Sequence, residues 1–476
     1  MYKIKQLLIW ILISYRFRTC LNKMLKHIQK TKRMASGHAL VVISPWFMTQ
    51  VPWFSMFVAI CLYNRGTGIT LLIDEMPFGA EKKMFKLQLA TIKWLAKRLT
   101  KIFQVDYIKP NDQFSFTESE QAYIKKQAWL NVVHDAKGEI PARKKPDLVS
   151  LYEKQLKKMY HPIRQYIAET KCDYIVLPGG VSSSSSIFMF WAKHHELRAS
   201  TFDSGVNTLL ISCQGVASQL NDIPSAYLKL LQNKAKMSFV ESYVEVELQK
   251  RMSGNDHWST QISNSNHELE EKKFVLLPLN ISWDSAALGL HKHYDTSIEW
   301  VLDTTRYILN NSSLSVVIRQ HPIERHDYAK SMDDYGQILA NEFGINERVI
   351  FIPSLENVSS YSLIEDASFV IPYTSTIGVE SAILGRAVIN VSSNYYSELE
   401  FNFTANTRKE YYRLILLAIN GELIVTAKMK KLAKYCYYLS QVCNWNFTDL
   451  APNSFIKKLA EGEFSELICE KEFSFV

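Results

Sequence analysis

The first part of the chain has no acidic residues. No Asp or Glu precedes Asp74, whereas ten Lys and Arg residues lie in that stretch. The whole chain of 476 residues carries a formal charge of +8, so the part after Asp74 is close to neutral. A nucleic-acid-binding protein more often carries its basic residues on a folded reading surface. Here most of them lie in residues 1–36, which predicts an anionic surface as partner and no nucleic acid.

The cysteines form no motif. Seven of them are scattered along the chain, an odd number without C-x-x-C spacing, at Cys20, Cys61, Cys172, Cys213, Cys436, Cys443 and Cys469. This pattern argues against a disulfide framework and against a zinc site. A reducing cytoplasm is therefore the simplest compartment.

The apolar run near the start is too short to cross a bilayer. Leu7–Ile13 has seven residues, whereas a spanning helix needs about 20. Ile4, Leu7, Leu8 and Ile11 would share one helix face, with basic side chains reaching toward lipid headgroups. This predicts an interfacial helix at a membrane surface. The alternative is a helix packed on the protein's own surface.

Apolar strands that alternate with helices predict an α/β fold with two Rossmann-like domains. The first β-α-β unit has no Gly-rich fingerprint, so we expect no dinucleotide site there. The polar stretch 253–273 is expected to be the interdomain linker. The predicted division is an arm at 1–36, a first domain at 37–252, the linker at 253–273, a second domain at 274–450, and a closing helix and tail at 451–476.

A hydroxyl-rich turn follows a short strand in the second half. Phe369–Ile371 is apolar, and Tyr373–Thr376 then leads into a helix that ends near Gly385. Ser375 or Thr376 is a good N-cap for that helix, and such a helix N-terminus can bind an anion. Glu380 could accept hydrogen bonds from ribose hydroxyls. The alternative is an ordinary capped helix.

Two further strands also end in polar residues. Leu314–Arg319 is followed by His321, and Phe274–Leu277 leads into Asn280–Ala286. An imidazole at a strand end can donate to a phosphate or to a leaving-group oxygen. In a parallel sheet the three strand ends lie at one edge, so we expect the three polar clusters to face one crevice. Alternatively, His321 only caps its own turn and Ser375 only its helix.

These three segments resemble bacterial capsule polysaccharide biosynthesis proteins. The motifs are N-x-x-W-D-S-A at Asn280–Ala286, R-Q-H-P-x-E at Arg319–Glu324 and T-S-T-x-G-x-E-x-x-x-x-G at Thr374–Gly385. That family is similar to the Kdo transferases of capsule export systems. The His-Pro motif followed by a Ser/Thr pair also resembles bacterial sialyltransferases of the GT-B fold. The resemblance is best over Phe274–Asn394.

The resemblance implies a GT-B glycosyltransferase, with two Rossmann-like domains that face each other across a cleft. The second domain would bind a nucleotide-sugar donor, with a CMP-sugar such as Kdo or sialic acid favoured. The acceptor, over the first domain, would be a growing capsular or surface polysaccharide or its lipid acceptor. The reaction is expected to be inverting and metal-independent, and the absence of a D-x-D motif agrees with that. No cofactor is expected, because the nucleotide sugar is a substrate.

The expected catalytic residues are Asp203 and His321. Asp203 follows the strand Arg198–Phe202, where a carboxylate facing the cleft is a candidate general base. Asp203-Ser204-Gly205 resembles the acidic residue before a glycine in sialyltransferase-like folds, and Glu241 and Glu245 are the competing carboxylates. The expected donor-binding residues are Asp284, Ser285, Arg319, Pro322, Glu356, Thr374, Ser375, Thr376, Gly378 and Glu380.

Other roles stay open at this stage. Ser182–Ser186 could cradle the acceptor or only cap a helix. The chain could also be a nucleotide-sugar epimerase of the same architecture, or a non-catalytic scaffold of a polysaccharide assembly complex. Turnover of a nucleotide sugar without acceptor would indicate the epimerase, and nucleotide binding would argue against the scaffold. The expected location is the cytoplasm, peripheral on the inner face of the bacterial inner membrane.

Overall fold

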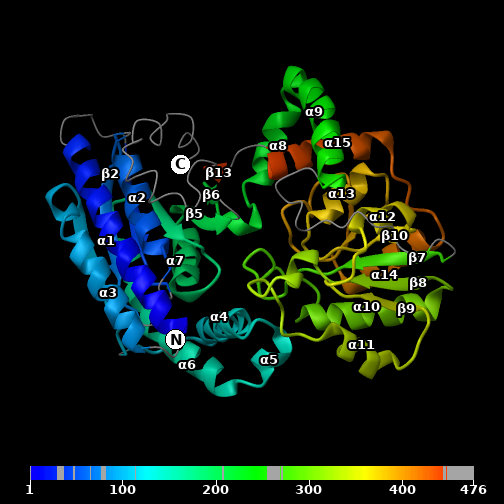
Figure 1. The fold of residues 1–476 in the computed structure, drawn as a ribbon, viewed down its shortest axis with the longest axis horizontal. Coiled ribbons are helices and arrows are strands. Elements are labelled where there is room, and N and C mark those ends of the chain that lie inside the picture. The colour runs from blue at the N-terminus through cyan, green and yellow to red at the C-terminus, as the bar shows by residue number, and fades with distance from the viewer. Residues whose placement is uncertain are drawn as a thin grey trace. The chain divides into compact units, whose positions relative to one another are not determined.

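The computed structural model describes residues 2–28, 37–46, 49–64, 66–76, 82–112, 114–205, 208–254, 269, 272–442 and 446–447. The chain forms two compact units (Figure 1). Unit 1 comprises residues 1–132, 145–222 and 444–476, and unit 2 comprises residues 133–144 and 223–443.

Unit 1 is built on a seven-stranded sheet of order β13-β6-β5-β4-β1-β2-β3. The strands β1 to β5 are parallel, whereas β6 is antiparallel to both β5 and β13. The reversal of strand order between β1 and β4 is a topological switch point. The strands are β1 (His38–Ile43), β2 (Gly68–Asp74), β3 (Gln104–Ile108), β4 (Tyr174–Pro178), β5 (Arg198–Gly205), β6 (Thr208–Ser212) and β13 (Asn446–Phe447).

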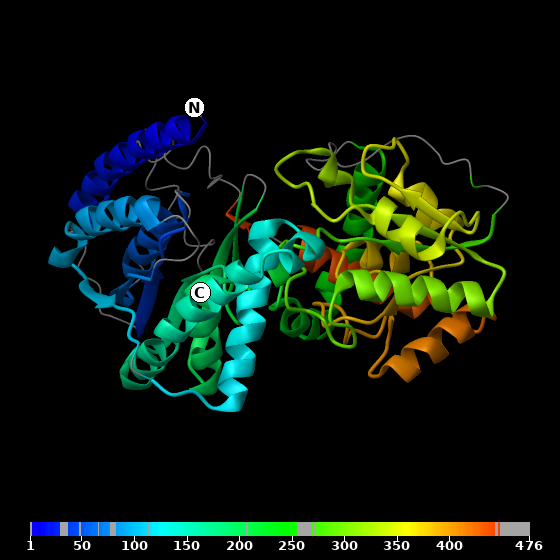
Figure 2. The same cartoon turned by 90° about the horizontal axis from the view of Figure 1, so that it is seen from below.

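Helices cover both faces of this sheet (Figures 1 and 2). Side chains alternate between the faces of a strand, so Ala39, Val41 and Ile43 of β1 all pack into the core that the sheet shares with α1, α2 and α3. The other face carries α7, which packs against β4 and β5. The helices of unit 1 are α1 (Tyr2–Ile28), α2 (Val51–Asn64), α3 (Lys82–Ala96), α4 (Glu118–Ala136), α6 (Pro146–Glu169) and α7 (Ser183–His194).

Helix α1 is part of unit 1, which corrects the expectation of a separate arm at 1–36. Trp10, Phe17 and Leu21 are buried in the core. The rings of Trp10 and Phe17 lie 5.8 Å and 5.6 Å from that of Trp53 on α2. These contacts match the alternative in which the helix packs on the protein's own surface. Residues 29–36 lie outside the described part of the chain.

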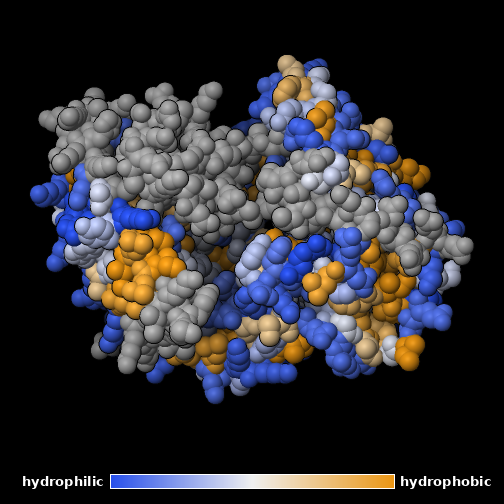
Figure 3. Space-filling model, viewed as in Figure 1, coloured by the Kyte–Doolittle hydropathy of each residue, from blue (hydrophilic) through white to orange (hydrophobic). Residues whose placement is uncertain are grey.

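The opposite face of α1 remains exposed. Its large side chains form what we call the α1 stripe, which consists of Leu8, Ile9, Ile11, Leu12 and Tyr15. Figure 3 shows a hydrophobic patch over this helix. The packing of α1 thus leaves an apolar face exposed. Its contact with a membrane surface stays a prediction. Within the described residues, no helix is both long and apolar enough to span a membrane.

Unit 2 contains a parallel sheet of order β10-β7-β8-β9. The place between β7 and β10 is again a switch point, because β8 and β9 lie on one side of β7 and β10 lies on the other. Val388 forms a parallel bridge to Val370 on the far side of β10. The predicted α/β class with two Rossmann-like sheets is therefore confirmed. The strands are β7 (Phe274–Pro278), β8 (Ser315–Arg319), β9 (Val349–Ile352), β10 (Phe369–Val370), β11 (Ile389–Asn390) and β12 (Phe403–Thr404).

The core of unit 2 lies between this sheet and its helices. Val275, Leu277 and Val316 from the strands pack with Trp300 of α10 and Leu414 of α14. The helices are α5 (Glu139–Arg143), α8 (Ile223–Leu231), α9 (Lys234–Met252), α10 (Ser297–Asn311), α11 (Tyr335–Phe343), α12 (Ser360–Asp366), α13 (Ile377–Ile383), α14 (Arg408–Ile419) and α15 (Ala427–Tyr437).

The division between the units differs from the predicted domain boundaries. Helices α8 and α9 belong to unit 2 because both pack against α15, so the boundary falls after Asp222 and not at residue 252. Residues 133–144, which include α5, also belong to unit 2. Most of the predicted linker 253–273 and all of the tail 451–476 lie outside the described residues.

Candidate functional site

Three strand ends meet at one edge of the unit 2 sheet. β10, β7 and β8 are parallel neighbours, so the loops that follow them emerge together. The N–H of Thr374 donates to Oδ1 of Asn280 at 3.0 Å, which joins the loop after β10 to the loop after β7. The three polar segments thus follow neighbouring parallel strands, as the sequence predicted, and their facing one crevice stays a prediction. In an open α/β sheet this edge is where ligands bind.

His321 follows β8 and caps the 3-10 helix η4 (Pro322–Arg325). Its Nδ1 accepts a hydrogen bond from the N–H of Ile323 at 3.2 Å, so the simple capping role is real. Burial, together with the smaller effect of the Arg251 and Arg319 charges, lowers the pKa of His321 to about 4. The ring is therefore neutral at pH 7, and Nε2 carries its proton. His321 can offer one N–H to an anion but does not carry a positive charge.

Arg319, the predicted charge for a phosphate, is held by the main chain. The guanidinium is almost fully buried, at 1% exposure, and burial lowers its pKa to about 10. Its nitrogen atoms donate to four carbonyl groups in the loop after β9, those of Ile352, Pro353, Glu356 and Val358. Arg319 therefore fixes the shape of that loop. Its contact with a phosphate stays a prediction.

The turn after β10 offers hydroxyl groups. The Thr374 hydroxyl is buried and has no hydrogen-bond partner among the described residues. The Ser375 Oγ accepts from the N–H of Ile377 at 3.4 Å, while its carbonyl accepts from the hydroxyl of Tyr396 at 2.8 Å. Thr376 is the N-cap of α13 but makes no side-chain capping bond. Because α13 is only seven residues long, the hydroxyls contribute more to an anion site here than the helix dipole does.

Arg251, which sequence reasoning missed, lies beside this turn. It comes from the last turn of α9, and its Nε lies 3.2 Å from Oε1 of Glu380 on α13. Its Nη1 donates to Oε1 of Gln441 at 3.0 Å. Because Arg251 also lowers the pKa of His321, the groups after β8 and β10 share one electrostatic environment. Glu380, predicted to accept from ribose, thus already faces a cation.

The other predicted donor residues have local roles in the structure. Asp284 Oδ1 accepts from the Ser285 hydroxyl and from the N–H of Ala286, both at 3.2 Å, which closes a turn. Pro322 begins η4. Glu356 has an exposed side chain, and only its carbonyl meets Arg319. A Cβ on Gly378 would lie 2.5 Å from the hydroxyl of Tyr396, so only glycine fits there.

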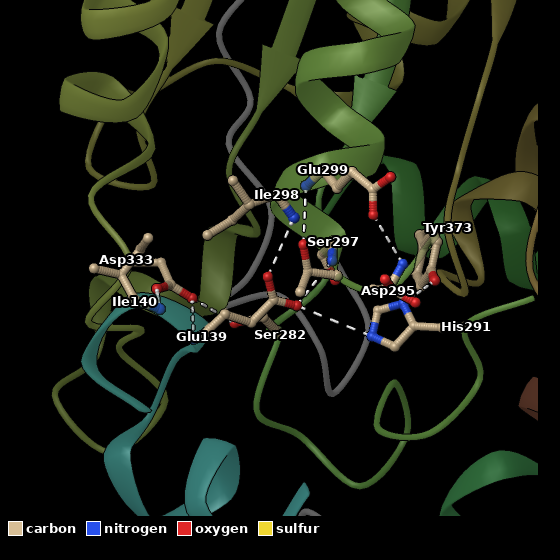
Figure 4. A network of polar contacts seen from close by, with 11 residues as sticks. Glu139, Ile140, Ser282, His291, Asp295, Ser297, Ile298, Glu299, Asp333 and Tyr373 are labelled. Atoms are coloured by element: carbon tan, nitrogen blue, oxygen red, sulfur yellow. Dashed lines mark hydrogen bonds and ion pairs between the residues drawn. The ribbon is translucent and has the colours of Figure 1, made fainter. Parts of the chain in front are cut away.

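A buried acidic network lies elsewhere in unit 2 (Figure 4). The Asp333 carboxylate accepts from the N–H groups of Glu139 and Ile140, both at 2.8 Å, and so caps α5. The Glu139 carboxylate accepts from the N–H groups of Ser297 and Ile298, at 2.8 and 3.2 Å, and so caps α10. Burial raises the pKa of Glu139 to about 7. The network thus fastens residues 133–144 to unit 2.

Figure 4 also shows His291 between this network and the turn after β10. Its Nε2 lies 4.0 Å from Oε1 of Glu139, and a hydrogen bond joins its Nδ1 to the hydroxyl of Tyr373. Tyr373 directly precedes Thr374, so His291 links the buried network to the residue before the hydroxyl-rich turn. Neither Glu139 nor His291 has a local sequence signal for this role, because their partners lie far away in the chain.

The carboxyl edge of the unit 1 sheet carries a different set of groups. Asp74 ends β2 and is 1% exposed. Its carboxylate accepts from the Ser184 hydroxyl, from the Ser44 hydroxyl at 3.4 Å and from the N–H of Met76 at 2.8 Å. Burial raises the pKa of Asp74 to about 6. Ser182 is the N-cap of α7 but makes no side-chain capping bond, and Ser184 in the first turn solvates the buried acid. A role of Ser182–Ser186 in holding the acceptor stays a prediction.

Asp203 lies inside β5, not at its end. The strand continues to Gly205 and turns back into β6, and Asp203 pairs with Leu210 in this antiparallel hairpin. The expected strand end at Phe202 is therefore wrong, because the pairing with β6 extends β5. The side chain of Asp203 is partly exposed. Its role as general base stays a prediction.

The competing carboxylates lie in unit 2, in helix α9, and not in the amino-terminal half of the fold. Glu241 accepts from the hydroxyl of Tyr435 at 2.6 Å and pairs with Lys431 at 2.8 Å. Glu245 pairs with Lys434. All three partners belong to α15, so both carboxylates fasten α9 to α15. These contacts favour a structural role.

Residues 223–400 match the family model described as capsule polysaccharide biosynthesis protein. This match confirms the resemblance that the three motifs indicated. The capsule-family segment lies within unit 2 and contains Arg251, His321, Thr374 and Glu380. Asp203 lies outside it. A search of curated proteins found no match.

Solved structures give distant similarity only. Two chains of KpsC from Thermosulfurimonas dismutans match at low identity. The beta Kdo 2,7 transferase has 12% identity and a TM-score of 0.36, covering 63% of this chain and 89% of that chain. The beta Kdo 2,4 transferase has 13% identity and a TM-score of 0.39, covering 60% and 87%. The UDP-GlcNAc 2-epimerase from Methanocaldococcus jannaschii has 10% identity and a TM-score of 0.27, covering 84% and 99%. These scores are all below 0.5, so the likeness carries no weight for function.

Proposed function

We propose that this protein is a glycosyltransferase of capsular or surface polysaccharide synthesis. Unit 2 binds the nucleotide-sugar donor, and a CMP-sugar such as Kdo or sialic acid is the favoured donor. The observation that supports this most is that His321 and the Thr374–Thr376 turn both follow strands of one parallel sheet, at the same carboxyl edge. That edge lies within the capsule-family segment.

The donor's phosphate would bind where these strands end. His321, neutral and protonated on Nε2, donates one hydrogen bond to a phosphate oxygen. The buried Thr374 hydroxyl, which has no protein partner among the described residues, and the Ser375 hydroxyl add further donors. Preorganised donors of this kind stabilise the charge that develops on the leaving nucleotide. Because the His321 ring is neutral, we assign it the role of hydrogen-bond donor and not that of general acid.

The acceptor hydroxyl would be activated from unit 1. Asp203 is the candidate general base there, and direct attack on the anomeric carbon would then invert its configuration. The acceptor is a growing polysaccharide or its lipid acceptor. Hydroxyl groups and neutral donors meet the phosphate in this scheme, so it needs no metal ion.

We also propose that the protein works at an anionic membrane surface. The α1 stripe presents five large apolar side chains on one face of a helix whose other face is anchored in the core. The chain before Asp74 carries ten basic residues and no acidic ones, and six of the ten lie in α1. An amphipathic helix with this charge lies in a lipid interface. The inner face of the bacterial inner membrane would provide both the surface and a lipid-linked acceptor.

The test of the donor site is His321→Ala. Loss of one preorganised donor costs ~10²–10³-fold in rate, so transfer from CMP-Kdo or CMP-sialic acid to the acceptor should fall by that factor. Thermal unfolding should be nearly unchanged, since His321 belongs to a loop and not to the core. His326→Ala, in the same loop, is the matched control and should retain transfer.

Three outcomes would contradict the proposal. If His321→Ala and His326→Ala transfer sugar equally well, the crevice is misassigned. If the protein converts a nucleotide sugar in the absence of any acceptor, it is an epimerase. If neither CMP, UDP, GDP nor their sugars raise its unfolding temperature, the non-catalytic scaffold is the better interpretation. A ligand at about 100 times its Kd should add ~2.7 kcal/mol of stability, which such a screen detects.

A further inference from the structure

The site after β8 and β10 has two guanidinium groups near His321, and their partners differ in kind. Arg319 donates to main-chain carbonyls of the loop after β9. To meet a phosphate it would have to abandon the backbone of that loop. Arg251 instead faces side chains, among them those of Glu380, Gln441 and Tyr361. Side chains can rotate away without any change in the backbone.

Arg251 is also placed between the two halves of the site. It lies on helix α9 and not in a loop that follows a strand. Its side chain pairs with Glu380 of α13, and its charge lowers the pKa of His321. A guanidinium has five N–H donors in a planar fork that matches two oxygen atoms of a phosphate. Glu380 and Gln441 are side chains, so they can give up part of that fork to a further acceptor without any change in the backbone.

The ion pair itself calls for an explanation. Both side chains are largely buried, with 16% exposure for Arg251 and 5% for Glu380. Burying two charges costs several kcal/mol per ion before their attraction repays it. An apolar pair would join α9 and α13 equally well. A charged pair at a strand-end crevice has the further property that the carboxylate keeps the cation in place while no anionic ligand is bound.

We propose that Arg251 is the cation that binds the phosphate of the nucleotide donor, and that Glu380 holds it in position in the empty site. This inference rests on the proposed function and adds a residue to the donor site. When nucleotide binds, a phosphate oxygen takes over part of the guanidinium fork. Glu380 is then available to the ribose hydroxyls. The two members of this ion pair would thus bind the phosphate and the ribose of the nucleotide.

The competing explanation is that the pair only ties α9 to α13. The two explanations predict different effects of a substitution at Arg251 on the affinities for ligands with and without a phosphate group. A structural tie changes the affinity for every ligand, or for none. A phosphate contact changes the affinity for CMP but leaves cytidine, which has no phosphate, almost unaffected. The ratio of the two dissociation constants within one variant is therefore the decisive quantity.

The experiment measures CMP and cytidine binding by calorimetry in the full chain. Arg251→Gln removes the cation, and hydrogen bonds to charged groups are worth ~10–150-fold in affinity. We expect the preference for CMP over cytidine to fall by roughly that factor. Lys250→Gln is the matched control on the same helix turn, because Lys250 is exposed and pairs only with Glu247 in the described structure. It should keep the wild-type preference.

A second pair of variants keeps the test valid if Arg251→Gln does not fold, since it leaves the Glu380 carboxylate buried without its cation. Glu380→Gln should retain a preference for CMP at least as large as that of the wild type. Arg251→Gln/Glu380→Gln, which buries no charge at this place, should lose it. Equal preferences in these two variants would overturn the role of Arg251 while leaving the proposed function intact. If the wild type binds neither CMP nor cytidine, the proposed CMP-sugar donor fails, and the inference fails with it.

Discussion

The two sheets share one parallel strand order, β4-β1-β2-β3 in unit 1 and β10-β7-β8-β9 in unit 2, but their carboxyl edges carry opposite charges. In unit 1 the ionisable group at the edge is Asp74, which accepts from two serine hydroxyls and one N–H. In unit 2 the edge carries His321 with Arg251 and Arg319 close enough to lower its pKa. The difference teaches that strand order fixes where a site lies, whereas the residues after each strand decide what it binds.

This contrast suggests a division of labour. A cationic and hydroxyl-rich edge suits the phosphate of a donor, and an edge rich in hydroxyls and carboxylates suits the hydroxyl groups of a sugar acceptor. Substitutions in unit 1 should then affect transfer without affecting the binding of nucleotide. Substitutions in unit 2 should affect both.

The largest expected effect tests the unit 1 side of this contrast. Asp203→Asn keeps the shape of the side chain and removes the base, so transfer should fall by ~10²–10⁴-fold. The affinity for CMP, measured by calorimetry, should stay at the wild-type value. Asp106→Asn is a control in the same sheet, since Asp106 is a partly exposed aspartate on β3. Near-normal transfer by Asp203→Asn would show that the base is another carboxylate.

The next effect is on the pH dependence of stability, and it involves one buried acid in each unit. The folded-state pKa is raised to about 6 for Asp74 and to about 7 for Glu139, from 3.8 and 4.5. Each acid therefore favours the folded state most while it is protonated. Unit 1 should lose that stability as the pH rises from about 4 to about 6, and unit 2 as it rises from about 4.5 to about 7. The loss is on the order of 3 kcal/mol for each group.

Urea unfolding at several pH values measures this loss. Asp74→Asn should flatten the pH dependence of unit 1, and Glu139→Gln that of unit 2. The slope with pH is the informative quantity, because either amide can also change the absolute stability. A wild-type slope in Glu139→Gln would mean that this carboxyl group does not titrate in the range described.

The smallest expected effect concerns the surface of unit 1. Leu8→Ser on the α1 stripe removes an apolar side chain that is 62% exposed. Burial of a Leu side chain is worth ~1.5–3 kcal/mol in full, so partial insertion should make binding to phosphatidylglycerol vesicles about tenfold weaker. Leu228→Ser is the matched control in unit 2, where Leu228 is 61% exposed. Equal vesicle binding by both variants would exclude the α1 stripe as the lipid contact. Deletion of residues 1–33 is a poorer test, because it also removes Trp10 and Phe17 from the core.

Local patterns in the sequence were enough to predict the strand ends of unit 2. Each of β7, β8 and β10 is a short apolar run closed by polar or proline residues, and this signal lies within a few positions. The sequence prediction ended the strand before Asp203. The hairpin in which Asp203 pairs with Leu210 has no local sequence signal. Arg251 was missed because it lies on a helix, seventy positions before His321. Its role depends on tertiary packing, which a single sequence does not encode locally.

Residues 133–144 have a consequence for the order in which the chain folds. Glu139 leaves the ribosome 158 residues before Ser297, whose N–H it will accept from. Until then its carboxylate has to stay in water, and α5 lacks its cap from Asp333, 194 residues later. The sheet of unit 1 also lacks its last strand until late, because β6 pairs with β13, which follows unit 2 in the chain. Neither unit is therefore completed before nearly the whole chain has been synthesised.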